Sequence, residues 1–203
     1  PDIPGKNQRH VFDGDELRGV LFGTNKEAVA KLSPFARLVL WAGRMSQALR
    51  SIRLMRFASK IWMPLADEIV VIGGGLVGLE LAEYLVERGR KVSVLEPGPS
   101  LGAELALVRR ARVLHLLRGH GVKIISNAPS RDISATEVIF EHKGEEQRLP
   151  AKQVVIALGA EGDSRLSDCL ADIDGQVHRV GDCRDISYID GAILSAREVV
   201  QSL

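Results

Sequence analysis

The chain has 203 residues and a formal net charge of +1. Its 45% share of hydrophobic residues is enough for one large core or two small ones. The balanced charge and the 4% share of aromatic residues argue against nucleic acid as a partner.

Cysteine and histidine give no indication of a metal site or of a catalytic residue. Cys169 and Cys183 form neither a C-x-x-C redox pair nor half of a zinc site. We expect both thiols to be buried or half-buried in a reducing compartment. His115 and His120 have no partner at a metal-ligand spacing. Because no signal-peptide pattern or membrane-spanning apolar run occurs, a cytoplasmic location is the default expectation.

The first 23 residues are predicted to be a loop followed by a short helix. Pro1, Pro4 and Gly5 break regular structure, and Asp13 or Asp15 can cap a helix over residues 16–22. Neither an initiating methionine nor a strand–glycine–helix unit precedes this segment in the chain. We therefore expect the chain to begin part-way through a domain.

Residues 31–63 form a basic segment in which Pro34 suits the first turn of a helix and Pro64 its end. Basic residues, without any acid, occupy seven positions: Lys31, Arg37, Arg44, Arg50, Arg53, Arg56 and Lys60. An apolar stripe recurs at helical spacing: Leu38, Trp41, Met45, Ala48, Ile52 and Met55. Such a helix can lie on a membrane surface or dock on a partner. We favour the alternative that the stripe packs on the protein itself while the arginines extend to solvent.

Residues 69–96 read strand, glycine turn, helix, strand. The β-branched run at 69–72 is typical of a buried parallel strand. Gly73, Gly75 and Gly78 then have the G-x-G-x-x-G spacing, and a helix that stops near Gly89 leads to a second strand at 91–95, which is followed by Glu96. The helix is predicted to bury Leu76, Leu79, Leu81, Ala82, Leu85 and Val86.

This arrangement predicts a dinucleotide site. Gly73 permits the tight turn, Gly75 lets the backbone approach a pyrophosphate, and Gly78 lets helix and strand pack closely. The free N–H groups of the first helical turn, which includes Leu76 and Val77, attract the phosphates. Glu96 can bind an adenosine ribose. The alternative is a glycine-rich turn that binds nothing.

The turn at residues 97–102 contains no arginine to hold a 2′-phosphate, and Glu96 would repel that phosphate. NAD(H) is therefore expected rather than NADP(H).

The remaining elements complete an α/β pattern. A helix is expected over residues 103–120, with Leu105, Val108, Val113, Leu116 and Leu117 inward. A strand at 122–125, an antiparallel meander over 136–149 and a buried strand at 153–157 follow. A short strand at 177–180, a turn at 181–183 and a helix over 190–203 end the chain. We predict a Rossmann-like, doubly wound parallel sheet with a small meander and a partial second module.

Three marks in this order resemble the pyridine nucleotide–disulfide oxidoreductase superfamily of two-dinucleotide flavoproteins. They are the Gly73–Glu96 fingerprint, the strand end VVIALGA at residues 154–160, and the turn HRVGDC at residues 178–183. The resemblance implies cofactor contacts at Leu158, which replaces the usual threonine, and at Gly159. It also implies that Gly181 and Asp182 bind FAD, although Asp182 alone would read as a capping residue.

The segments PDIPG, HVFDGDELRGVLFG and VGDCRDISYIDGAILSAREVVQSL resemble the C-terminal portion of a narrower group. It comprises flavin enzymes related to dienoyl-CoA reductase, trimethylamine dehydrogenase and 2-enoate reductase. In that group an N-terminal barrel carries FMN and an iron–sulfur cluster. The resemblance implies FAD-module remnants at 1–30 and 161–203, a basic helical insert at 31–66 and an NAD(P) module at 67–160. We therefore expect an excised fragment that lacks the barrel.

In the parent enzyme this portion would let NAD(P)H deliver hydride to FAD, and the isolated fragment is expected to be inactive. The resemblance places an acid such as Glu80, which we expect in the first turn of the binding helix, near the nicotinamide. Glu80 can equally be a surface acid that stabilises the helix dipole. Two rivals stay open, namely a structural ADP-binding domain without hydride transfer and an interaction module that acts through the basic helix.

Overall fold

The computed structural model describes residues 2–22, 24–45, 59, 61–159, 162–170, 173 and 175–202. The chain divides into two compact units, Pro1–Leu158 and Gly159–Leu203, called here the first and the second unit. Among the described residues, no helix has both the length and the apolar character to cross a membrane.

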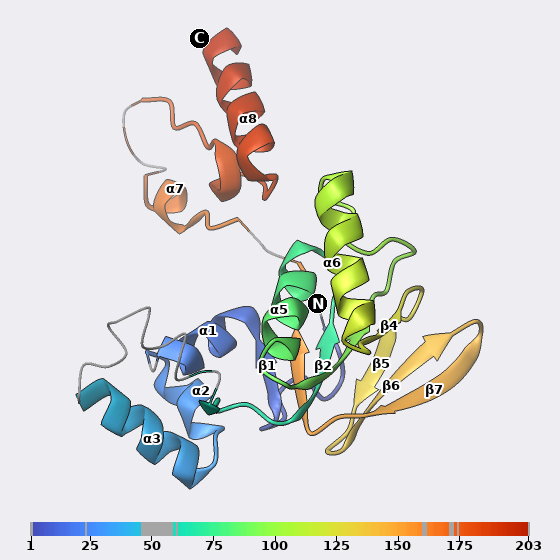
Figure 1. Cartoon of the computed structure of the whole chain (residues 1–203). Coiled ribbons are helices and arrows are strands. Elements are labelled where there is room, and N and C mark those ends of the chain that lie inside the picture. The colour runs from blue at the N-terminus through green and yellow to red at the C-terminus, as the bar shows by residue number, and fades with distance from the viewer. Residues whose placement is uncertain are drawn as a thin grey trace. The chain divides into compact units, whose positions relative to one another are not determined.

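A five-stranded parallel sheet forms the centre of the first unit (Figure 1). Its order is β1 (Val11–Asp13), β8 (Gln153–Ile156), β2 (Glu68–Ile72), β3 (Lys91–Leu95) and β4 (Lys123–Ile125). Each neighbouring pair is parallel. The predicted α/β class with a parallel sheet is therefore confirmed.

Helices cover one face of this sheet. Alternate strand residues such as Ile69 and Val71 pack against α5 (Leu76–Val86) and α6 (Leu107–Gly119) in one buried cluster. The short helices α1 (Gly14–Phe22), α2 (Lys26–Ala30) and α3 (Pro34–Met45) contribute side chains to the same cluster. Gly89, at φ +72°, follows the end of α5, as the pattern predicts.

The helix α6 is shorter than predicted. It begins at Leu107 rather than at residue 103, and residues 101–105 form turns instead. Val113 and Leu117 are buried as expected, but Val108 is 83% exposed. The apolar spacing therefore identified the inner face of the helix without locating its first turn.

The other face of the parallel sheet is covered by a second, antiparallel sheet. This small sheet consists of β5 (Ser130–Ile133), β6 (Glu137–His142) and β7 (Glu145–Pro150). Phe140 and Ile133 pack there against Val70, Ile72 and other residues of the large sheet. Lys143 and Gly144 connect β6 to β7 with positive φ values of 55° and 79°, as a tight two-residue hairpin requires. The predicted meander is confirmed.

The strand β1 is absent from the sequence-based prediction, which assigned residues 1–15 to a loop. Val11 and Phe12 are almost fully buried, and β1 pairs with β8 at the end of the sheet. Asp13 then caps α1. Its Oδ1 accepts the N–H of Glu16 at 2.7 Å, and Glu16 Oε2 accepts the N–H of Asp13 at 3.3 Å, which is a capping box.

The predicted apolar stripe of α3 faces away from the core. Leu38, Trp41 and Met45 are 60%, 61% and 68% exposed, whereas Ala36 and Leu40 on the opposite side are buried. The expectation that the stripe packs on the protein is therefore wrong for these residues. The rest of the predicted helix, with Ala48, Ile52, Met55, Arg50, Arg53 and Arg56, lies outside the described residues.

The second unit contains α7 (Arg165–Cys169), the short 3-10 helix η2 (Gly181–Cys183) and α8 (Tyr188–Ser202). The predicted strand at 177–180 is wrong. Val177 and Val180 are 43% and 39% exposed, and no described segment of this unit is a strand that could pair with them. Cys169 and Cys183 are exposed free thiols, contrary to the expected burial.

Candidate nucleotide-binding site

The turn between β2 and α5 is built around Gly73. Gly73 has φ +114°, and a Cβ at this position would collide with the carbonyl oxygen of Ala157 at the end of β8. Its N–H donates to the carbonyl oxygen of Leu95 at 2.8 Å, at the end of β3. The turn is thus fixed between the carboxyl ends of two parallel strands, where α/β folds bind ligands.

Gly78 brings α5 directly onto this turn. A side chain there would collide with the carbonyl oxygen of Gly73. Gly75 is the N-cap residue, and no side chain caps the helix. The N–H groups of the first turn therefore keep their capacity to bind an anion. Gly73 and Gly78 therefore both stand where the backbone leaves no room for a side chain.

Glu96 joins the glycine turn to the loop after β3. Its Oε2 accepts the N–H of Gly74 at 2.7 Å, and its Oε1 accepts the N–H of Gly98 at 2.7 Å. Each carboxylate oxygen has a second lone pair. Glu96 therefore orders both loops and retains acceptor capacity for a ribose hydroxyl.

A short segment after this loop lies over the glycine turn. Gly102 donates its N–H to the carbonyl oxygen of Gly74 at 2.7 Å, and Leu101 lies against the Cα of Gly74. Glu104 approaches Gly75 so closely that an added Cβ would lie 3.0 Å from Glu104 Oε1. This exposed carboxylate sits at the start of α5, where the fingerprint predicts a pyrophosphate.

Glu104 is not among the residues predicted from the sequence. It belongs to no motif, and the conformation of residues 97–106 alone carries it to the turn.

The other predicted residues of α5 have different surroundings. Leu76 is half-buried and Val77 is 59% exposed in the first turn. Glu80 was predicted to lie in the first turn of the binding helix. The helix begins at Leu76 and its first turn carries no acid, so Glu80 lies beyond that turn. Its Oε1 lies 3.5 Å from Nη2 of Arg109 on α6. Glu80 is therefore partly neutralised by a neighbouring helix.

Leu158 lies beside the glycine turn. Its Cδ2 is 3.1 Å from the position of a Cβ on Gly73, and the side chain packs against the buried cluster beneath the small sheet. Gly159 follows with φ +70° at the start of the second unit. The structure thus brings Leu158 together with Gly73, Gly75, Gly78 and Glu96.

Gly181 and Asp182 belong to the second unit. Gly181 has φ +65° and donates its N–H to Ser195 Oγ of α8 at 2.9 Å. Asp182 is exposed in η2, and its carbonyl oxygen lies 2.6 Å from the position of a Cβ on Gly162. Both residues therefore occupy a tight turn that is packed on α8 and on residue 162.

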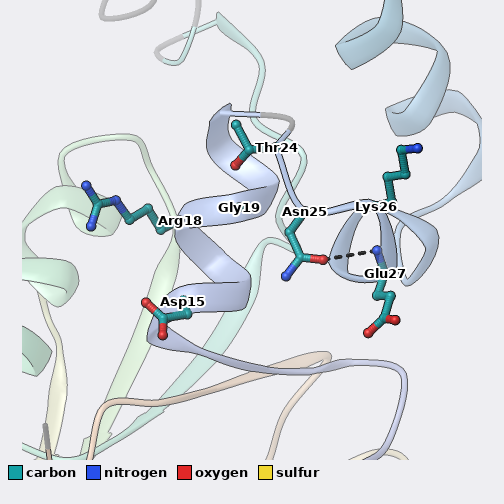
Figure 2. Close-up of a pocket in the computed structure, with 7 residues that line it drawn as sticks. All are labelled: Asp15, Arg18, Gly19, Thr24, Asn25, Lys26 and Glu27. Carbon is teal, nitrogen blue, oxygen red and sulfur yellow. Dashed lines mark hydrogen bonds between the residues drawn. The ribbon is translucent and has the colours of Figure 1, made fainter. Parts of the chain in front are cut away.

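A separate surface hollow lies between α1 and α2 (Figure 2). Its lining is polar and of mixed charge: Asp15, Arg18, Gly19, Thr24, Asn25, Lys26 and Glu27. Asn25 caps α2 there, because its Oδ1 accepts the N–H of Glu27 at 3.0 Å. These residues have capping and surface roles, and none belongs to the glycine turn.

The sequence profile of the pyridine nucleotide-disulphide oxidoreductases matches residues 38–181, which include the glycine turn, Glu96 and Gly181. This chain belongs to that family. The assignment confirms the superfamily that the three sequence marks resemble.

Relatives within the family are flavoprotein-type oxidoreductases of much greater length. The chain is 35% identical over 120 residues to a bilirubin reductase of Mediterraneibacter gnavus, across 59% of this chain and 19% of that protein. It is 28% identical over 148 residues to an NADH oxidase of Thermoanaerobacter brockii, across 70% of this chain and 22% of that protein. The chain thus spans about a fifth of the length of these two relatives.

Among solved structures, a 2-naphthoyl-CoA reductase superposes with a TM-score of 0.67 at 22% identity. The superposition covers 95% of this chain and 23% of the reductase. At this identity the likeness shows the fold alone, and it confirms the predicted Rossmann-like α/β arrangement.

Proposed function

We propose that this chain is the NAD(H)-binding portion of an FAD-dependent oxidoreductase related to dienoyl-CoA reductase, trimethylamine dehydrogenase and 2-enoate reductase. One observation carries the proposal. The turn at Gly73 and Gly78 tolerates no Cβ, opens onto an uncapped helix start, and is tied to the strand-end acid Glu96 by a 2.7 Å hydrogen bond. Family membership supports it.

Different residues bind different parts of the dinucleotide. The N–H groups of Leu76 and Val77 at the uncapped start of α5 hold the pyrophosphate, and Gly75 lets it approach the backbone. Glu96 accepts the ribose hydroxyls through its free lone pairs. Glu104 must turn away when the phosphates arrive, because its carboxylate lies against the same glycine. The turn therefore fits a dinucleotide once this one exposed side chain has moved.

NAD(H) is the preferred nucleotide in this proposal. A 2′-phosphate would meet the Glu96 carboxylate, and the loop at residues 97–102 supplies no cation to hold it. When bound, the nicotinamide would supply a hydride and the flavin would accept it. The chain's own part is binding and orientation.

The flavin site is completed by other parts of the protein. Residues 67–160 form the NAD module, with Leu158 and Gly159 at its edge, and residues 1–30 and 161–203 belong to the FAD module, where Gly181 and Asp182 contact FAD. FMN and an iron–sulfur cluster would lie on a barrel outside this chain. The isolated chain is therefore expected to have little oxidoreductase activity. We place the parent enzyme in the cytoplasm.

Parallel calorimetric titrations with NADH, NADPH and ADP test the proposal. Binding of NADH that is clearly tighter than binding of ADP would support recognition of the nicotinamide half. Preference for NADPH would show that Glu96 does not set the specificity. No binding of any nucleotide would overturn the proposal.

A second candidate function, a structural ADP site without hydride transfer, is favoured by the position of Glu80. The resemblance assigns this acid to the nicotinamide, whereas here its Oε1 lies 3.5 Å from Arg109 on α6. Equal affinities for NADH and ADP would support this candidate. Reduction of FAD by NADH in the full-length protein would contradict it.

A further inference from the structure

The peptide that joins Gly74 to Gly75 has no side chain on either flank. A peptide between two glycines can rotate with little steric resistance. Such a rotation exchanges the directions of the Gly74 carbonyl oxygen and the Gly75 N–H, because these two groups point opposite ways in a trans peptide. The glycines that let a pyrophosphate approach therefore do not determine which of the two groups faces it.

Two residues of the loop after β3 fix the orientation of Gly74. Its N–H donates to Glu96 Oε2 at 2.7 Å, and its carbonyl oxygen accepts the N–H of Gly102 at 2.7 Å. Gly74 is buried, so a rotated peptide would deprive a buried carbonyl oxygen of its donor. The hydrogen bond from Gly102 therefore holds the carbonyl oxygen toward Gly102, and the N–H of Gly75 points away from it.

The protein makes no use of the N–H of Gly75. Within the described part of the chain, the N–H groups of Gly75, Leu76 and Val77 donate to no protein acceptor. Gly75 is half-buried and is the N-cap residue of α5. Successive N–H groups without an acceptor at a helix start favour an anion.

Residues 101–105, called here the strap, hold Gly102 in place. Leu101 lies against the Cα of Gly74, and both Leu101 and Leu105 pack on the buried cluster beneath α5. Leu105 donates its N–H to the carbonyl oxygen of Gly102 at 3.0 Å. Gly102 has φ +55°, and an added Cβ would lie 2.9 Å from Leu105 Cδ1. Backbone conformation and packing thus both favour glycine at this position of the strap.

We propose that Gly102 is a positioning residue of the nucleotide site. Its N–H fixes the peptide between Gly74 and Gly75, so that the N–H of Gly75 donates to the pyrophosphate. In the rotated peptide the Gly74 carbonyl oxygen would face the phosphates and repel them. This inference rests on the proposed function and adds to it a residue outside the glycine fingerprint. The strap therefore contributes to phosphate binding, whereas Glu96 contributes to ribose binding.

Replacement of the Gly102 amide by an ester tests this role. Glycolic acid at position 102, introduced as an α-hydroxy acid, removes the N–H donor and adds no Cβ, so the backbone conformation stays accessible. The control is the same replacement at Gly121, at the end of α6. Gly121 also has a positive φ, 74°, and it donates its N–H to the carbonyl oxygen of Arg118 at 2.9 Å. Each variant therefore loses one backbone hydrogen bond of similar length.

Calorimetry should show that NADH affinity falls by about fivefold in the Gly102 ester, the effect of one neutral hydrogen bond, and is unchanged in the Gly121 ester. Adenosine has no phosphate, so its affinity, measured by NMR titration, should be the same in both esters and in the unmodified chain. With isotope-labelled glycine, NADH should shift the amide signal of Gly75 in the unmodified chain and in the Gly121 ester, but much less in the Gly102 ester.

Three outcomes would count against the proposal. Unchanged NADH affinity in the Gly102 ester, while the unmodified chain binds NADH, would overturn the role of Gly102 and leave the proposed function standing. An equal loss of NADH and adenosine affinity would show that Gly102 supports only the fold. No binding of NADH by the unmodified chain would overturn both this inference and the proposed function.

Discussion

The N–H of Gly74 donates to Glu96 Oε2 across 2.7 Å, which links the turn before α5 to the residue that follows β3. A second hydrogen bond, from Gly98 to Glu96 Oε1, ties down the loop beyond it. One carboxylate therefore orders both walls of the proposed ribose site. The oxygen atoms of Glu96 must therefore hold the two loops and bind the ribose at the same time.

Replacement of Glu96 by glutamine should weaken both the ordering of the two loops and the binding of NADH. The glutamine amide oxygen can still accept one backbone N–H, but the amide NH2 group then faces the other backbone N–H. One charge-assisted hydrogen bond is therefore lost, at a cost of about 2 kcal/mol. NADH affinity should fall by about tenfold or more, and the preference for NADH over NADPH should narrow. Calorimetry measures both quantities. Glu145→Gln, at the exposed start of β7, is the control, and equal effects in the two variants would contradict the assignment.

Replacement of Gly78 by alanine should destabilise the first unit by about 3 kcal/mol, because the new methyl group collides with the carbonyl oxygen of Gly73. Gly119→Ala, at the end of α6, is the matched control, since nothing lies within 4 Å of the added Cβ. That change should be neutral or stabilising by up to about 1 kcal/mol. Urea unfolding followed by circular dichroism measures both. A stable G78A variant would refute the close packing.

Replacement of Glu104 by glutamine should strengthen nucleotide binding. The change removes a negative charge beside Gly75, and a like-charge contact in water is worth about 1 kcal/mol, or about fivefold in affinity. NADH and ADP should gain equally, because both carry the pyrophosphate. Glu87→Gln, an exposed acid beyond the other end of α5, should have no effect. Unchanged or weaker binding in E104Q would show that Glu104 helps to hold the ligand.

Stability should fall on acidification through His10. Burial lowers the pKa of His10 below its ordinary value of 6.5, against a smaller opposing effect of a hydrogen bond with the Ser134 backbone. The unfolded chain therefore takes up the proton first, so this stability is complete above pH 6.5 and is lost as the pH falls toward the folded pKa.

Urea unfolding at about pH 7.5 and about pH 5.5 measures that loss. His10→Gln should flatten the pH dependence, whereas His115→Gln, at an exposed position on α6, should leave it unchanged. The same pH dependence in the unmodified chain and in H10Q would exclude His10 as its source.

Local patterns predicted the parts of the fold that local forces determine. The spacing of Gly73, Gly75 and Gly78 between a buried strand and a helix defined the turn, and Lys143-Gly144 defined the hairpin. The strand β1 was missed because three residues carry too little periodicity. It becomes a strand only through its pairing with β8. The segment 177–180 has the composition of a strand but no described partner in its own unit.

The spacing of apolar residues identified the stripe on α3 but did not show whether the stripe faces the core or the solvent. The helix has apolar side chains on two sides, and Ala36 and Leu40 face the core whereas Leu38 and Trp41 face solvent. The position of Glu104 could not be predicted from the sequence either, because only the geometry of the loop places it against Gly75. Sequence patterns therefore predicted the glycine turn well and the surfaces around it poorly.

The order of strands in the large sheet has a consequence for how the chain folds. β8 is the last of its strands to be synthesised, yet it lies between β1 and β2 and pairs with both. On the ribosome β2, β3 and β4 can assemble early, while β1 waits unpaired and β2 exposes an open edge. Contacts so distant along the chain slow folding. A nascent chain that stops before Gln153 would expose the unpaired β1 and the open edge of β2, and both invite aggregation.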